Sequence, residues 1–146
     1  MEGEFVVFLI GMRVNKPWMV GKWLPVKKAM KRMLGELLKN PASGLLGFES
    51  AIYNRTSIIV QYWESFEKLE AYARARDKQH FPAWIEFYKR VGNTGAVGLW
   101  HETYKIQPQG YEAIYYNMPP YGLGKIGKLV PAKGRHESAR DRINEK

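Results

Sequence analysis

The chain has 146 residues, of which 45% are hydrophobic and 14% aromatic, so it is not wholly disordered and is most simply one folded domain. It contains no cysteine, which excludes disulfides, thiolate metal sites and cysteine nucleophiles and fits a reducing, cytoplasmic compartment. The net charge is +9, and +4 of it lies from residue 125 onward, where there are seven Lys and Arg residues and three acidic residues. This distribution is typical of solvated helix faces with a basic tail. We therefore expect no specific nucleic-acid partner.

The first half of the chain predicts a strand, a helix and a hairpin. Residues 5–14 (FVVFLIGMRV) are apolar on both alternating faces, as in a central strand, and the run is too short to span a membrane. Residues 25–40 form an amphipathic helix, with Pro25 as its first residue, where the missing N–H costs nothing. Two strands, 45–53 and 57–63, are close enough for a hairpin.

The second half predicts two helical pieces and two strands. Ser65 is a suitable N-cap for a helix over residues 66–75, and Pro82 restarts a helix that ends before Gly92. The run VGLWHETYKI (97–106) reads as a strand, and YEAIYYNM (111–118) reads as a further strand. From about residue 131 the chain is polar and charged.

This order of elements predicts an α+β fold of the ferredoxin-like βαββαβ type, with an antiparallel sheet and helices on one face. Residues 1–124 form this domain and residues 125–146 form a basic C-terminal arm with a flexible end. Since the strands are apolar or aromatic on both faces while helices cover only one, the second face needs a partner, and we expect a homodimer.

Several stretches resemble a known superfamily. VQYWESFEKLEAYARARDKQHFPAW is similar to the strand-to-helix signature of antibiotic-biosynthesis-monooxygenase-type domains. GEFVVFLIGMRVNK, RVGNTGAVGLWHETY and YEAIYYNMPPYGLG resemble a branch of small bacterial and fungal monooxygenase-like proteins that includes an oxygenase of fumagillin biosynthesis. The resemblance implies a dimeric α/β barrel that holds its ligand between the sheet and the helices of one subunit or at the dimer boundary. Its relatives include cofactor-free oxygenases and haem enzymes, but the histidine that binds iron in haem-degrading relatives has no counterpart in AWIEFYKRV.

The histidines are the first candidates for chemistry. His136 lies in the tail, and His80 stands before a helix restart, where it is either a capping residue or a base or metal ligand at the pocket mouth. In a strand, His101 and Glu102 point to opposite faces and cannot form an acid/base pair. Either His101 faces the pocket as base or ligand, or Glu102 does, and we favour His101. No histidine spacing fits zinc.

Aromatic residues are the candidate lining of a dry pocket, in which a base could form a carbanion that reacts with O₂. Aromatic residues at strand or helix spacing are also common in an ordinary hydrophobic core. The cationic side chain of Arg13 is a further candidate for contact with the ligand, either with the substrate or with a haem propionate. The predicted substrate-binding residues are Trp63, Trp84, Trp100, Tyr104, Tyr115 and Arg13.

Three functions remain open. We favour a small monooxygenase-like enzyme that acts on an apolar or aromatic molecule without a cofactor. The first alternative is a haem protein of the same fold with His80 or His101 as axial ligand, and the second is a non-catalytic dimer that binds a small molecule.

Overall fold

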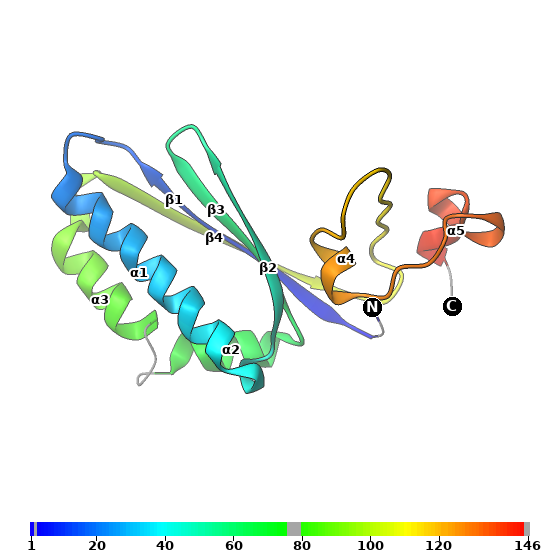
Figure 1. Cartoon of the computed structure of the whole chain (residues 1–146). Helices are drawn as coiled ribbons and strands as arrows, with labels where there is room; N and C mark the ends of the chain where they lie inside the picture. The colour runs from blue at the N-terminus through cyan, green and yellow to red at the C-terminus, as the bar shows by residue number, and fades with distance from the viewer. Residues whose placement is uncertain (2, 76–79, 145–146) are drawn as a thin grey trace.

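The computed structural model describes residues 1, 3–75 and 80–144, and only the backbone of residues 80–84. Four strands, β1 (Phe5–Val14), β2 (Leu45–Tyr53), β3 (Thr56–Trp63) and β4 (Val97–Ile106), form one antiparallel sheet in the order β2-β3-β1-β4. The helices α1 (Val20–Lys39), α2 (Phe66–Arg74) and α3 (His80–Arg90) cover one face of this sheet (Figure 1). The predicted ferredoxin-like βαββαβ fold is therefore confirmed.

Local sequence explains most of the element boundaries. Asn54 adopts a left-handed conformation (φ 53°) in the two-residue turn between β2 and β3, a conformation that Asn tolerates better than most residues. Ser65 caps α2, since its hydroxyl accepts a hydrogen bond of 3.3 Å from the Lys68 backbone N–H. Gly92, with φ 41°, follows the end of α3 closely, as predicted.

The predicted start of the first helix is wrong. Helix α1 begins at Val20, so that Pro25 lies inside it. Pro25 has no N–H to donate to the carbonyl of Gly21, four residues earlier, but Gly21 is exposed and water can satisfy that carbonyl. The expected amphipathic pattern is otherwise present, with Val26, Met30 and Leu37 buried.

The hydrophobic core consists of two clusters at opposite ends of the helix-side face. One cluster gathers Met12, Val26, Met30, Val91, Ala96 and Val97, and the other gathers Val6, Leu37, Trp63 and Leu69. Phe8 and Ile10 occupy the rows of β1 between these clusters and are only partly buried. The middle of the helix-side face is therefore less tightly filled than its ends.

The other face of the sheet, which we call the open face, is not covered by α1, α2 or α3 (Figure 1). Gly11 of β1 lies here beneath the side chain of Trp100, and a Cβ at Gly11 would come within 2.3 Å of the Trp100 Nε1 atom. The absence of a side chain at Gly11 thus leaves room for the indole of Trp100.

The predicted strand at residues 111–118 is wrong, because this run is irregular and pairs with no strand among the residues that the structure describes. Near its end, Asn117 has a left-handed backbone conformation (φ 52°). Two prolines follow, which have no N–H to donate to the hydrogen bonds of a sheet. Residues 107–144, which we call the C-terminal segment, extend beyond one end of the sheet and contain the short helices α4 (Leu123–Ile126) and α5 (Ala139–Asn144) (Figure 1).

The C-terminal segment is attached to one end of the open face. The rings of Phe5 and Tyr111 meet edge to face with centroids 5.1 Å apart. The Glu49 carboxylate accepts a hydrogen bond of 3.0 Å from the Gly122 backbone N–H and forms an ion pair of 2.6 Å with Lys125. These contacts hold α4 against β2.

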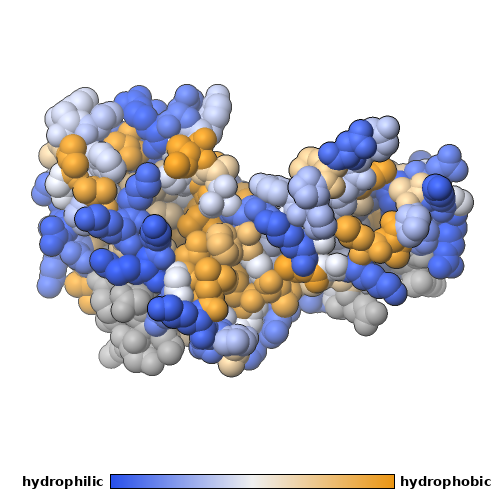
Figure 2. All heavy atoms as spheres, viewed as in Figure 1, coloured by the Kyte–Doolittle hydropathy of each residue, from blue (hydrophilic) through white to orange (hydrophobic). Residues whose placement is uncertain are grey.

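Side chains of opposite character gather on different parts of the surface. Hydrophilic side chains cover much of the helix-bearing end of the molecule, and hydrophobic ones gather in the middle of the view, around β2 (Figure 2). No helix among the described residues is both long enough and apolar enough to cross a bilayer.

Candidate active site

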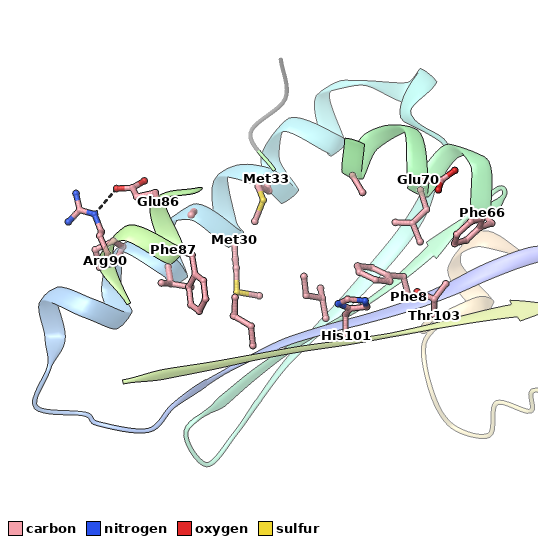
Figure 3. Close-up of a pocket in the computed structure, with 17 residues that line it drawn as sticks. Phe8, Met30, Met33, Phe66, Glu70, Glu86, Phe87, Arg90, His101 and Thr103 are labelled. Carbon is pink, nitrogen blue, oxygen red and sulfur yellow. Dashed lines mark hydrogen bonds and ion pairs between the residues drawn. The ribbon is translucent and has the colours of Figure 1, made fainter. Parts of the chain in front are cut away.

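A cavity of about 320 Å³ lies between the sheet and the helices, in the loosely filled middle of the helix-side face. We call it the main cavity. Strands β1 and β4 form its floor and helices α1, α2 and α3 form its walls (Figure 3). The lining side chains are largely apolar, and they include Phe8, Ile10, Met30, Met33, Phe66 and Phe87. A cavity of this size and character suits a small apolar ligand.

His101 lies on the floor of the main cavity, and it is the only described imidazole among the lining residues. It shares this face of β4 with Leu99 and Thr103, because side chains alternate along a strand. The imidazole packs beside the ring of Phe8, with centroids 5.6 Å apart and an angle of 40° between the planes (Figure 3). His101 is solvent-accessible, so its ring nitrogens can meet a ligand that enters the cavity.

Carboxylates and a guanidinium among the cavity lining are paired within their own helices. Arg90 donates from Nε to Glu86 at 2.8 Å, and Glu70 binds Arg74 at 2.8 Å. Arg90 is the only Lys or Arg among the described lining residues. An anionic ligand would therefore have to compete with Glu86 for its cation, which favours an uncharged ligand.

A smaller cavity of about 60 Å³, which we call the inner cavity, adjoins the main one. The two cavities share Phe8, Ile10 and Met30 in their linings, and the inner cavity extends toward β3. Its lining includes Trp63, Gln61 and Tyr72. Burial beside Glu36 raises the pKa of the Tyr72 phenol, so this group stays protonated at neutral pH.

The predicted site residues fall into separate places. His101 lies in the main cavity, and Trp63 is fully buried at the inner cavity. The side chains of His80 and Trp84 lie outside the described part of the structure. Glu102 lies on the open face, where the Tyr104 hydroxyl donates to its carboxylate at 2.5 Å, so Glu102 does not share a cavity with His101.

The remaining predicted lining residues, among the described part of the chain, do not line either cavity. Trp100 and Tyr104 alternate with His101 and therefore point to the open face. Arg13 is exposed and donates to Asn15, two residues along the chain. Tyr115 lies in the C-terminal segment, where its hydroxyl accepts from the Gly124 backbone N–H at 2.8 Å.

Sequence reasoning missed most polar residues of these cavities, which include Gln61 and Thr103 as well as the charged Glu70, Glu86 and Arg90. The sequence did contain a signal for Gln61. In the strand run SIIVQYW, Gln61 is the amide residue that interrupts a series of apolar and aromatic residues from Ile58 to Trp63. It also shares a strand face with Trp63, two residues later. A polar side chain on a buried strand face needs a hydrogen-bonding partner, and such a residue is a candidate for ligand contact.

With this geometry established, comparison with known proteins places the chain among its relatives. The model of a family described as monooxygenase af470-like matches residues 5–123. The chain belongs to the monooxygenase af470-like family. This assignment confirms the resemblance to monooxygenase-like proteins that the sequence suggested.

The individual proteins that match this chain have low sequence identity to it. Monooxygenase af470 of Aspergillus fumigatus is 27% identical over 133 residues, which cover 85% of this chain and 46% of that protein, so the chain spans less than half the length of this relative. A conserved protein of unknown function from Bacteroides thetaiotaomicron shares the fold with a TM-score of 0.50 at 13% identity, over 70% of this chain and 97% of that one. A conserved protein from Methanosarcina mazei matches with the same TM-score and identity, over 68% and 91% of the two chains.

Proposed function

We propose that this family member is an oxygenase that acts on an uncharged, apolar or aromatic small molecule in the main cavity, with His101 as general base and without a bound cofactor. The observation that carries the proposal is one accessible imidazole on the floor of an otherwise largely apolar cavity. An imidazole can accept a proton near neutral pH, and apolar walls limit the access of water to a reactive intermediate.

The proposed reaction needs a substrate with an acidic CH₂ group next to an electron-rich ring, because one hydrogen leaves as the proton and the second is lost with water. His101 takes this proton, and the carbanion transfers an electron to O₂ and combines with it to give a peroxide anion. The imidazolium returns the proton to the peroxide, and loss of water then leaves a new carbonyl on the carbon that was deprotonated. One oxygen atom enters the product and the other leaves as water. Thr103, on the same strand face as His101, is within the lining and can hydrogen-bond the substrate.

Dithranol (1,8-dihydroxyanthrone) is a suitable probe, because its C10–H is acidic and its carbanion reacts with O₂. We expect the protein to consume O₂ with dithranol above the uncatalysed rate. The His101→Ala variant should lose about 10²–10⁴-fold of this acceleration, which is the usual contribution of a general base. Glu102→Ala is the matched control, since Glu102 is the next residue on the same strand and faces away from the cavity.

The outcomes of this assay separate the functions. Equal loss in both variants, or no loss in His101→Ala, would contradict the base assignment. Binding of dithranol without O₂ uptake in the wild-type protein would instead favour the non-catalytic ligand-binding module.

The residues of the cavity fit haem poorly. Haem needs an axial ligand and cations for its two propionates. His101 could serve as the ligand, but Arg90 is bound to Glu86, and Glu70 adds a second carboxylate to the described lining. We expect hemin titration to give no Soret shift that depends on His101. A shifted band that His101→Ala abolishes would favour the haem protein.

The homodimer belongs to the same proposal. Outside the C-terminal segment, the open face carries apolar and aromatic side chains such as Leu9 and Trp100, with Tyr104 exposed. Burial of this face against a second copy would remove them from water. Light scattering should give twice the chain mass of 16.9 kDa, and a monomer at micromolar concentration would count against the dimer.

A further inference from the structure

Gln61 is a buried amide side chain at the end of the cavity system that the proposed reaction does not use. It is 7% exposed and lies on the helix-side face of β3, opposite Phe8 of β1. It lines the inner cavity among side chains that are mostly apolar, such as Met30, Leu34 and Leu37. Burying an amide costs free energy unless its donors and acceptor are paired, so its hydrogen bonds decide what it can do.

A neighbouring indole sets the orientation of this amide. The Trp63 Nε1–H donates a hydrogen bond of 3.0 Å to Gln61 Oε1. Because an indole nitrogen can only donate, the atom that faces it must be the amide oxygen, and the –NH₂ group must point elsewhere. Among the hydrogen bonds between described residues, none uses Gln61 Nε2. The side chain therefore keeps two donors available in an otherwise apolar region.

The register of the sheet places these donors relative to His101. Phe8 of β1 pairs with Gln61 on one side and with Thr103 on the other, and His101 stands one pair further along, opposite Ile10. Since adjacent strands lie about 4.8 Å apart, the Cα atoms of Gln61 and His101 are separated by about 12 Å across the sheet. The ring of Phe8 lies on the strand between them and packs beside His101.

We infer that Gln61 is a specificity-determining residue, which donates a hydrogen bond from Nε2 to a carbonyl-type acceptor on the far end of the substrate. This inference rests on the proposed function for the position of the reacting end. The substrate is then an uncharged molecule of about two fused rings, with its acidic group at His101 and its body over Phe8. Its acceptor is carried on a small group, because the inner cavity holds about 60 Å³.

The test is a pair of ligands that differ in one group. 6-Acetyl-2-naphthol carries a naphthol at one end and a carbonyl at the other, and 6-ethyl-2-naphthol has a nearly identical shape without the carbonyl. We expect the wild-type protein to bind the acetyl compound about threefold to tenfold more tightly, as one neutral hydrogen bond in place of an unpaired donor predicts. In Gln61→Met this ratio should fall to about one.

Two further variants keep the test independent of folding. Gln61→Glu keeps an oxygen for the Trp63 indole, and its ionised carboxylate has no donor, so at a pH where the carboxyl is ionised the ratio should fall to about one or below. Gln109→Met changes an exposed glutamine outside both cavities and should keep the wild-type ratio. In the wild-type protein, the ¹⁵N–¹H signals of the Gln61 amide should shift with the acetyl compound and stay in place with the ethyl compound.

Several results would overturn the inference. They are an equal affinity of the wild-type protein for both ligands, a preference that survives in a folded Gln61 variant, and the failure of both ligands to bind. Failure of the oxygenase proposal alone would be recognised by different results. Dithranol oxidation would then be unaffected by His101→Ala, while the preference for the acetyl compound would still depend on Gln61.

Discussion

On its helix-covered side the sheet carries an apolar cavity with few polar groups, whereas on its open side polar groups of the same strands bind one another. His101 and Glu102 show this contrast at adjacent positions of β4. His101 faces the cavity beside Phe8, and Glu102 accepts a hydrogen bond from Tyr104. A polar side chain without a protein partner in an apolar setting is available for a ligand, while one that is already paired stabilises the fold. This contrast supports the proposals that the ligand binds on the helix side and that a second copy packs against the open side.

The largest effect should come from the interior of the helix-side face. Trp63 is fully buried between the inner cavity and Leu69, so Trp63→Ala removes a large packed side chain. We expect the free energy of unfolding to fall by about 3–5 kcal/mol. Chemical denaturation measures the change.

Trp18→Ala is the matched control for this substitution. Trp18 is 76% exposed, and its removal should change the free energy of unfolding by less than about 0.5 kcal/mol. Similar effects of the two substitutions would mean that Trp63 is not packed into the helix-side core.

A smaller effect is expected where the C-terminal segment meets the open face. The hydrogen bond from Lys125, followed by that from the Gly122 N–H, holds the pKa of the Glu49 carboxyl below its ordinary value. A lowered folded-state pKa contributes stability that is complete above the unfolded value of about 4.5 and is lost as the pH falls through the folded value. Glu49→Gln should therefore cost about 1 kcal/mol at pH 7, and less at acidic pH.

Denaturation of the wild-type and Glu49→Gln proteins at pH 7 and at pH 3.5 tests this sign. Glu64→Gln, at an exposed residue, provides the control and should be neutral at both pH values. A difference between Glu49→Gln and wild type that grows on acidification would show that the carboxylate does not hold the segment.

Alternation along strands and periodicity along helices are local properties, and they predicted much of the fold. The period of two in VGLWHETYKI separated His101 from Glu102. The helical period predicted an apolar stripe on α1, of which Val26, Met30 and Leu37 are buried but Leu38 is 58% exposed. The same local rules failed at residues 111–118, where β-forming residues are present but none of the four described strands pairs with them. Strand formation depends on pairing, which a single segment does not reveal.

The site was less predictable than the fold, because a cavity is a gap between elements that are distant in sequence. Aromatic content selected Trp100, Tyr104 and Tyr115, yet their strand face or segment carries them away from the helices. The role of Gln61 depends on the Trp63 indole and on the empty space beside it. Neither the direction of that hydrogen bond nor the space can be derived from residue types alone.

The central claim is that the ligand occupies the helix-side cavity and not the open face. Methionine-methyl and indole N–H NMR signals report on both places in one sample, since Met30 and Met33 line the main cavity and Trp100 lies on the open face. On addition of 6-acetyl-2-naphthol, we predict large shifts of the Met30 and Met33 methyl signals, with the Trp100 indole and the exposed Met118 nearly unchanged. Shifts of Trp100 with unchanged Met30 and Met33 would contradict the account.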